Sequence, residues 1–562
     1  MTVSALRARL TGLLARTALL VSALTLLARL VGFGRWLVFS PTVGAGAVGT
    51  AYQSANMVPN ILFEVVAGGA LAGAVVPLLA VPLARRAAAD ARESAAGTAD
   101  ANRIVSALLT WALAATVPLA LALALLSGPI SGLLVDPGPA RTYAAGFLLV
   151  FAVQLPFYAV SAVLTGVLQA HRRFLWPAFV PLLSSLVVIG TYGVYGALAT
   201  DPDVAAPSAL ALLAWGTTAG VFALSLPLAL PTARTGIRVR PTFRFPPGVA
   251  RRAVRLATAG IVALAAQQAA VLVTMLVSNR VGGDGVFVVF SYVQAIYLLP
   301  YAVLAVPVAT IAFQNLSALL AEGADAGEHV RRTTTRVLWL GVLGGTVLVA
   351  ASEPLQTFFG LLDAAGPERF TGMAAAVVLM ALAVPGWCLV AWLQRVLYAH
   401  ERGRYVARGT ALGWAGVALT VLIGAAVLLG GTGSPGEVAA GATVSTALAA
   451  RTLGLVGLAH AVGMTLAAVL LFAAVRRVLG LVSWRRMLRD VFLAGSTAVV
   501  AAGAGVLVAR GLAVWPLLDA GTVLEAGGIP AALGVAVLRG VCAGLVAAGL
   551  VALPLRLLVY RR

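Results

Sequence analysis

The chain has 562 residues, of which 61% are hydrophobic and 10% are charged. This composition excludes an ordinary soluble domain and is typical of a polytopic membrane protein, whose solvent is the lipid bilayer. The 39 basic residues give a net charge of +20 but are dispersed through short loops, which disfavours nucleic-acid binding, and the two cysteines, Cys388 and Cys542, offer no disulfide framework.

Apolar runs follow one another along the whole chain. Arg7, Arg9 and Arg16 precede the first run, and because no convincing cleavage site follows them, we expect a retained helix rather than a signal peptide. Each run is long enough to cross a bilayer as a helix. The sequence therefore predicts an all-α polytopic membrane protein of about fourteen transmembrane helices, near residues 17–39, 48–82, 104–127, 142–168, 175–197, 207–231, 253–280, 285–320, 336–360, 373–398, 409–430, 452–475, 490–515 and 530–555.

The arginines are distributed unevenly between the two sides of the predicted membrane. An even number of helices places both termini on one side. If that side is the cytoplasm, most arginines fall in cytoplasmic loops, while Arg29, Arg35 and Arg395 lie within the membrane. The positive-inside rule therefore predicts cytoplasmic termini.

The longest basic loop, residues 234–252, has the sequence RTGIRVRPTFRFPPGVARR. It separates six predicted helices from eight. We therefore predict an N-terminal six-helix lobe at 1–233, this connector, a C-terminal six-helix lobe at 253–475 and two additional helices at 476–562. The loop either only sets the topology or also binds anionic lipid headgroups, which arginine-rich segments beside a membrane attract.

Two segments resemble each other along their full length. QLPFYAVSAVLTGVLQAHRRF and AVPGWCLVAWLQRVLYAHERG align without a gap and pair Pro156 with Pro385 and His171 with His400. The chain contains only 4 histidines, so a chance pairing of two of them is improbable. This match indicates an internal repeat, a feature common in transporters.

A weaker match places Pro59 and Pro300 at corresponding points of long helices. In the predicted topology all four paired prolines lie on helices that run from the external to the cytoplasmic side, so the two lobes are predicted to be parallel repeats. Proline inside a helix frees a carbonyl and bends the axis. We therefore expect Pro59, Pro156, Pro300 and Pro385 to kink helices that line a cavity or act as gates.

A polar stripe lies in the second predicted helix. Gln53, Asn56, Asn60 and Glu64 are three, four and four residues apart, a spacing that places them on one helical face. Polar and ionisable side chains are costly in hydrocarbon and face a bundle interior or a water-filled cavity. The stripe therefore indicates a surface inside the bundle.

Other polar side chains extend this prediction to a central cavity. Arg29 and Arg35 lie in the first helix, Gln267 lies in the seventh and Gln294 lies in the eighth. Two interpretations remain open. The groups either pair internally, for example Arg35 with Glu64, or they line a hydrated cationic cavity for an anionic or diphosphate headgroup, which the guanidinium fork suits.

No catalytic constellation accompanies these groups. His171, His329, His400 and His460 do not have metal-ligand spacing, and the chain lacks the GxxxxGK[ST] loop that binds ATP. We therefore predict a transporter rather than an enzyme, with no catalytic residue, metal or cofactor. An ion gradient, the membrane potential or substrate flow would drive it.

One segment carries a resemblance to a known family. ARLVGFGRWLVFSPTVGAGAVGTAYQSANMVPN, which continues to residue 80, resembles the N-terminal signature of the MurJ/MviN family, and GVLQAHRRFLWPAFVPLL resembles the family's cytoplasmic loop and fifth helix. This family belongs to the multidrug/oligosaccharidyl-lipid/polysaccharide exporters, which have two six-helix lobes. The resemblance implies that Arg29 and Arg35 match arginines of the family that face the central cavity.

The resemblance also implies a function. Members of the family flip lipid II, the undecaprenyl-diphosphate-linked peptidoglycan precursor, from the cytoplasmic to the external leaflet of the bacterial cytoplasmic membrane by alternating access. This activity supports cell-wall synthesis, so cell-wall enzymes are potential partners. Alternatives are a flippase for another polyprenyl-diphosphate-linked glycan, a cation or drug antiporter on the same fold, and a membrane scaffold.

The sequence departs from the family pattern at several positions. Trp36 and Thr50 stand where many members have aspartate, and Phe63 and Glu64 replace a basic pair. Ala295 replaces an arginine that many members carry on the eighth helix. We therefore expect a cavity that is less cationic than the pattern implies.

Overall fold

The computed structural model describes residues 3–65, 72–87, 90–199, 201–431, 441–480 and 484–556. Within these ranges every regular element is a helix. The chain divides into two compact units, Met1–Leu264 and Ala265–Arg562. The division falls inside the helix α11 (Val249–Arg280), beyond the basic connector. The predicted all-α membrane fold is confirmed.

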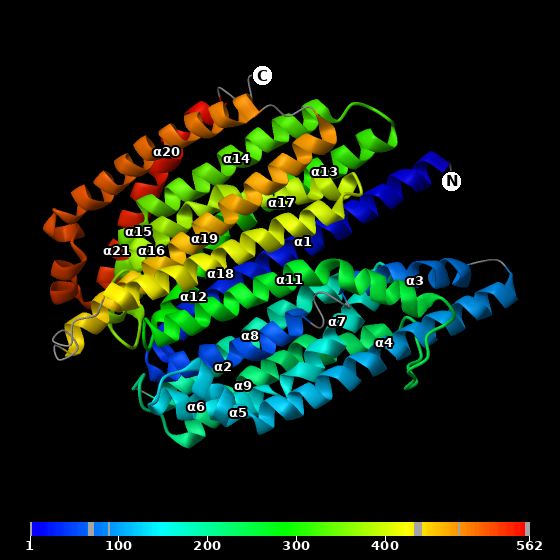
Figure 1. Cartoon of the computed structure of the whole chain (residues 1–562), viewed down its shortest axis with the longest axis horizontal. Helices are drawn as coiled ribbons and strands as arrows, with labels where there is room; N and C mark the ends of the chain where they lie inside the picture. The colour runs from blue at the N-terminus through cyan, green and yellow to red at the C-terminus, as the bar shows by residue number, and fades with distance from the viewer. Residues whose placement is uncertain are drawn as a thin grey trace. The chain divides into compact units, whose positions relative to one another are not determined.

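Within its described residues, the first unit contains ten helices, a short 3-10 turn and the start of α11 (Figure 1). Its elements are α1 (Val3–Thr42), α2 (Ala47–Phe63), α3 (Ala72–Arg86), α4 (Ala91–Leu125), α5 (Ser127–Leu134), α6 (Pro139–Phe151), α7 (Gln154–Ala170), α8 (Leu175–Leu198), α9 (Pro207–Ser225), η2 (Leu226–Leu228) and α10 (Ala229–Ala233). The helix α1 packs on α8, α8 packs on α9, and α2 packs on α6. The helices α3, α4 and α7 pack against one another around buried side chains that include Val75, Ile104 and Val163.

The second unit repeats this order of elements and ends with two additional long helices. Its elements after α11 are α12 (Val286–Pro300), η3 (Tyr301–Ala305), α13 (Val306–Ala321), α14 (Gly327–Ala350), α15 (Ser352–Leu362), η4 (Pro367–Phe370), α16 (Met373–Ala381), α17 (Ala383–Ala399), α18 (Gly403–Gly431), α19 (Gly441–Leu479), α20 (Trp484–Ala513), η6 (Pro516–Leu518) and α21 (Ala520–Leu555). The helix α17 packs between α14 and α19, and α20 and α21 pack on each other and on α14.

The described helices account for most of the predicted spans. Within the described part of the chain 11 helices are long and apolar enough to cross a membrane, and the number rises to 13 if each bent helix pair is one span. The remaining predicted run, 48–82, corresponds to α2 and α3, between which residues 66–71 lie outside the described part. The count of fourteen is therefore not confirmed.

The four paired prolines lie in two different local structures. Pro59 lies inside α2 and is followed at residues 64–65 by a π-helical turn, and Pro300 ends α12 directly before the π-helical η3. A π turn is a common response to a disrupted hydrogen-bond ladder. Pro156 and Pro385 instead lie in the first turns of α7 and α17, where a missing N–H costs nothing because first-turn amides have no helical acceptor. The bends there, 45° and 40°, come from the breaks that precede the two helices.

The ends of α7 and α17 have the same local structure. Both helices have 17 residues and end at a histidine, followed by a residue with positive φ: Arg172 has φ 58° and Glu401 has φ 57°. The His171 Nδ1 atom lies 2.9 Å from the Val167 carbonyl oxygen, and the equivalent distance from His400 to Val396 is 2.8 Å. The repeat inferred from sequence therefore extends to the backbone conformation.

The basic connector runs along α4. Its backbone N–H groups donate, at every second residue, to side-chain oxygens one helical turn apart. The three bonds join Arg238 to Asn102 (2.9 Å), Arg240 to Ser106 (2.9 Å) and Thr242 to Thr110 (3.0 Å). The match is geometric, because two extended residues and four helical residues each advance about 6 to 7 Å. We call residues 102, 106 and 110 the α4 ladder.

Other contacts hold the connector at both ends of the α4 ladder. Ile237 is buried in the core around α3, α4 and α7, and Phe245 packs against the same core. The Arg86 guanidinium donates to the Thr235 carbonyl oxygen at 2.9 Å. The Trp111 indole N–H donates to the Phe243 carbonyl oxygen at 3.1 Å. The connector is therefore a packed part of the first unit.

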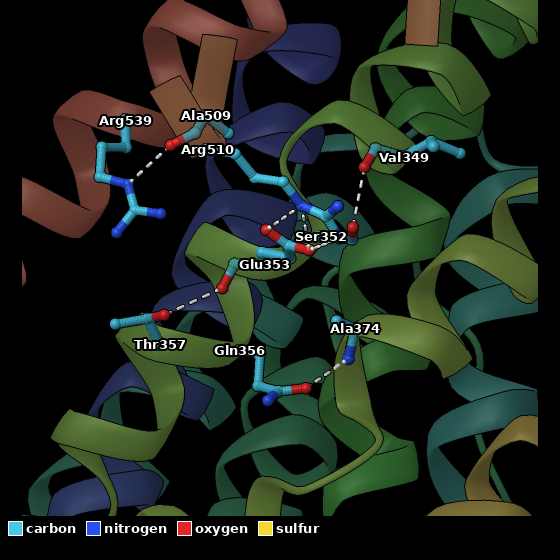
Figure 2. A network of polar contacts seen from close by, with 9 residues as sticks. All are labelled: Val349, Ser352, Glu353, Gln356, Thr357, Ala374, Ala509, Arg510 and Arg539. Atoms are coloured by element: carbon cyan, nitrogen blue, oxygen red, sulfur yellow. Dashed lines mark hydrogen bonds and ion pairs between the residues drawn. The ribbon is translucent and has the colours of Figure 1, made fainter. Parts of the chain in front are cut away.

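Polar contacts join the two additional C-terminal helices to each other and to α15 (Figure 2). The Arg510 Nε of α20 donates to both Glu353 carboxylate oxygens of α15, at 3.0 and 3.2 Å. The Arg539 Nε of α21 donates to the Ala509 carbonyl oxygen at 3.1 Å. Figure 2 also shows the Gln356 amide oxygen accepting a hydrogen bond from the Ala374 N–H at 2.8 Å, which joins α15 to α16.

Candidate substrate-binding residues in the membrane

The two arginines of α1 point to different sides of that helix. They are six residues apart, which rotates their side chains by about 120° relative to each other on a regular helix. Arg29 is exposed and Arg35 is half-buried. Arg35 is therefore the arginine directed toward the interior of the first unit, and the orientation of both arginines toward a central cavity stays a prediction.

Arg35 lies among aromatic side chains. Its guanidinium carbon is 5.8 Å from the centroid of the Trp36 ring, and it interacts electrostatically with the phenols of Tyr52, Tyr158 and Tyr192. In the described ranges no carboxylate forms an ion pair with Arg35. The guanidinium is thus a cation in a membrane-spanning helix, without a neutralising partner there.

The tyrosines near Arg35 form a buried polar cluster. The Tyr52 hydroxyl lies 2.9 Å from the Tyr192 hydroxyl and 3.0 Å from the Thr217 hydroxyl, which joins α2, α8 and α9. Tyr52 is only 1% exposed, and the Phe39 ring of α1 packs against it at 5.7 Å between centroids. The sequence analysis did not identify this cluster, because tyrosines at these spacings are as common in ordinary cores as in sites.

The polar stripe lies along α2. The helix has helical φ and ψ through Glu64, so Gln53, Asn56, Asn60 and Glu64 lie on one side of it. Gln53 is buried and the other three are half-buried. The Asn60 side-chain amide donates to the Asn56 carbonyl oxygen at 2.8 Å, a bond that uses up one donor within the helix itself.

The expected ion pair between Arg35 and Glu64 does not form among the described residues. The reason is the position of each group along the bundle. Arg35 lies near Tyr52, and Glu64 is twelve residues further along α2, about 18 Å on a straight helix. The interpretation that the polar groups pair internally is therefore not supported by an ion pair between Arg35 and Glu64.

The start of α2 is fixed from the loop between α8 and α9. The Asp203 carboxylate accepts a hydrogen bond from the Ala47 N–H at 2.7 Å, and the Pro202 carbonyl oxygen accepts one from the Val48 N–H at 3.1 Å. First-turn amides of a helix lack internal acceptors, and a carboxylate there also complements the helix dipole. These bonds hold the helix that carries the polar stripe.

The remaining predicted residues belong to the second unit. Gln267 lies in α11 and Gln294 lies in α12, and both are half-buried. The structure therefore brings together the predicted residues of α1 and α2 in one unit and places these two glutamines in the other.

Metal-ligand groups are absent from the described residues: no three His, Cys, Asp or Glu side chains lie close enough to hold an ion. One pattern in the sequence could have been recognised but was not among the predictions. The α4 ladder consists of Asn102, Ser106 and Thr110, whose spacing of four residues could have indicated a chain lying along that face.

Comparison with known proteins identifies the family. The profile of the family "Lipid II flippase MurJ" matches residues 39–523. A probable lipid II flippase MurJ from Rhizobium meliloti (strain 1021) is 26% identical over 425 residues, which are 73% of this chain and 74% of that protein. The lipid II flippase MurJ of Burkholderia cenocepacia is 29% identical over 353 residues, 61% of this chain and 63% of that protein.

Solved structures share the fold. A structure of lipid II flippase MurJ in an inward closed conformation superposes with a TM-score of 0.71 at 16% identity, covering 96% of this chain and 100% of its own. An inward-facing multidrug resistance MATE family transporter of the MOP superfamily has a TM-score of 0.58 at 13% identity, covering 82% of this chain and 98% of its own. Because the family profile spans most of its length, this multi-pass membrane protein belongs to the lipid II flippase MurJ family.

Proposed function

We propose that this protein flips lipid II from the cytoplasmic to the external leaflet of the bacterial cytoplasmic membrane, and so supports cell-wall synthesis. Family membership supports the substrate class. The observation that carries the chemistry is Arg35, a half-buried guanidinium in a membrane-spanning helix, without an ion pair in the described ranges. Such a group requires an anion, and a diphosphate fits its fork of donors.

The surroundings of Arg35 favour a large anionic headgroup over a cationic drug. An antiporter for cations needs carboxylates at its site, whereas the neighbours of Arg35 are phenols and an indole. The amides of Asn56 and Asn60 offer hydrogen bonds to sugar or peptide groups. Another polyprenyl-diphosphate-linked glycan satisfies the same chemistry and remains the alternative substrate.

Complementation tests this proposal. The gene is expressed in a bacterium whose own lipid II flippase is depleted, and growth and externally accessible lipid II are measured together. We expect both to recover. A host that gains drug resistance, while neither its growth nor its external lipid II recovers, would point to the antiporter instead. Failure of both despite normal membrane expression would point to a different lipid-linked glycan.

We propose alternating access as the mechanism, with the paired prolines at the moving points. The π turns after Pro59 and Pro300 support this idea, because they interrupt the regular ladders of equivalent helices. A single cysteine at Asn56, with Cys388 and Cys542 replaced, provides the test. Membrane-impermeant maleimide should label it from either side, and lipid II should change the ratio of the two. Labelling from one side only, in every condition, contradicts the mechanism.

We also propose that both termini are cytoplasmic and that the connector contacts anionic lipids. Arg238, Arg240 and Arg244 are exposed and alternate with Val239 and Phe243, which are 48% and 56% exposed. In a chain that advances two residues per ladder bond, alternate residues share a face. One face is therefore basic and the other apolar, as a segment lying at the headgroup level requires.

A lipid-binding measurement checks the connector. Replacing Arg238, Arg240 and Arg244 with glutamine should reduce binding of phosphatidylglycerol to the purified protein, and leave binding of phosphatidylcholine unchanged. The matched control is the triple glutamine variant of Arg485, Arg486 and Arg489, exposed arginines at the start of α20. Equal loss in both triple variants would show that only net charge matters.

A further inference from the structure

One side of α17 carries polar and aromatic side chains that are not fully buried. Trp387, Gln394 and Arg395 are half-buried, and Tyr398 is exposed. Their spacing of seven, one and three residues gathers them on one side of the helix. The other sides of α17 are buried against α14 and α19. This polar side lies within a span that is otherwise apolar, so its presence requires an explanation.

Arg395 has no neutralising partner among the residues that the structure describes. Its guanidinium Nη1 donates to the Ala391 carbonyl oxygen, four residues earlier, at 2.7 Å, and no ion pair involves it in the described ranges. An arginine near a helix end commonly extends past that end to reach the headgroups. Arg395 instead turns back toward its own preceding turn. This bond uses one of the guanidinium's five N–H donors.

Trp387 lies two turns earlier on the same side. Its ring contacts the Tyr301 ring of η3, at 5.6 Å between centroids, and the Trp414 ring of α18, at 5.8 Å. Its indole N–H is buried and has no acceptor in the described part of the chain. A buried unsatisfied donor costs about 1–3 kcal/mol, so an indole at this position is less stable than a ring without the N–H. Such a group is expected where a ligand supplies the acceptor.

One ring that packs on Trp387 belongs to a π-helical turn. Tyr301 is the first residue of η3, the π-helical turn that follows Pro300. A π turn has a weaker hydrogen-bond ladder than an α-helix and is frequent at functional sites. Displacement of this turn would uncover the indole N–H beside the donors of Gln394 and Arg395.

We propose that this side of α17 is a second subsite for the transported headgroup, in which Arg395 binds an oxyanion and the Trp387 indole N–H donates to a neighbouring oxygen. The proposal rests on the proposed flippase function and deepens it. The oxyanion is a carboxylate of the peptide part or a phosphate of the diphosphate, because both match the guanidinium fork. It places a cation for the headgroup in the second unit, in addition to Arg35 in the first.

The subsite makes a prediction that a purely structural role does not. A donor kept for a ligand costs stability when the ligand is absent. Trp387→Phe, which keeps an aromatic ring and removes the N–H, should therefore raise the melting temperature of the ligand-free protein and weaken binding of lipid II about threefold. Arg395→Gln should weaken binding about tenfold or more, since hydrogen bonds to a charged group are the stronger class.

The experiment measures binding of purified wild-type and variant proteins to three probes, together with their melting temperatures. The probes are lipid II, lipid II with amidated peptide carboxylates, and undecaprenyl diphosphate. Loss in Arg395→Gln with lipid II only identifies the carboxylate, and an equal loss with all three identifies the phosphate. Arg476→Gln, which changes an exposed arginine in the last turn of α19, is the matched control and should bind every probe as the wild type does.

Three results separate the possible failures. If the wild type binds none of the probes, the proposed function fails. If the wild type binds lipid II and both variants bind it equally well, the subsite is wrong while the function stands. If Arg395→Gln does not fold, Arg395→Lys keeps the charge without the fork and should bind more weakly than the wild type; unchanged affinity in that variant also overturns the subsite.

Discussion

The helices α7 and α17 have the same length, similar bends before them and the same turn after them. They differ in the residues that equivalent positions carry. Where α17 has Arg395, α7 has Gly166, and a Cβ added to Gly166 would lie 2.6 Å from the Val75 Cβ of α3. The side that packs tightly in the first unit therefore carries a charge in the second. A repeated backbone specifies where a helix lies, while the residue at each position decides whether it packs or binds.

The strongest test of this difference places the arginine of α17 at the equivalent position of α7. Gly166→Arg should abolish folding of the first unit, because the closest atom is a Cβ of the facing helix and not the end of a flexible chain. Even Gly166→Ala should destabilise by about 1–3 kcal/mol, as expected of overpacking. The measurement is the folded fraction after detergent extraction, with Arg395→Ala as the reciprocal control, which should fold normally. A well-folded Gly166→Arg protein would contradict the claim that this side of α7 is too tightly packed for a long side chain.

The α4 ladder offers the next largest effect. The combined change Asn102→Ala, Ser106→Ala and Thr110→Val removes three acceptors of connector N–H groups. Three lost bonds should weaken docking of the connector by about 1.5–4 kcal/mol. Limited proteolysis with trypsin, which cleaves after arginine unless proline follows, then becomes faster at Arg238 and Arg244. An unchanged cleavage rate would show that Ile237 and Phe245 hold the connector by themselves.

The third turn of α17 offers a smaller test of packing in the second unit. The Trp392 indole N–H donates to the Thr334 hydroxyl of α14 at 3.0 Å, and both side chains are buried. The equivalent residue of α7 is Val163, which needs no acceptor. Thr334→Val should lower the free energy of unfolding by about 1–3 kcal/mol, because it leaves the indole N–H unsatisfied. A Thr334→Ser variant, which retains the acceptor, should lose less.

The smallest expected effect is a pH dependence at the end of α7. Burial lowers the pKa of the His171 imidazole below its usual value of 6.5, Arg86 and Arg173 lower it further, and the hydrogen bond with Val167 opposes them. The unfolded chain therefore binds more protons between the two pKa values, so stability falls as the pH drops through and below about 6.5. Melting temperatures from pH 7.5 to 5.5 should fall more for the wild type than for His171→Asn. Parallel profiles would contradict the assignment.

Much of the fold could be predicted from the sequence because the signals are local. Apolar runs define the helices. The paired segments that contain His171 and His400 indicate a repeat, and in the structure both segments have the same backbone turn after the histidine. Proline effects were less predictable. Pro156 and Pro385 lie in first turns, where they disrupt nothing, because a sequence does not show where a helix breaks just before a proline.

The site was less predictable because it depends on contacts between helices. The pairing of Arg35 with Glu64 is plausible from charge alone, yet Arg35 of α1 lies near Tyr52 in the first half of α2, whereas Glu64 lies at the end of α2. Tyr52 was missed because its importance comes from Tyr192 and Thr217, which lie far away in the sequence. Charge and spacing identify candidate residues, but only packing shows which of them meet.

The most direct test of the account is charge reversal at Arg35. Arg35→Glu should insert and fold, because Arg35 forms no ion pair within the described ranges, but it should abolish the appearance of lipid II at the external leaflet. Membrane expression and externally accessible lipid II are measured in the same cells, with Arg29→Glu as the matched change on the exposed side of α1. We predict normal expression without flipping for Arg35→Glu. A well-expressed Arg35→Glu protein that flips lipid II at the wild-type rate would contradict the central claim.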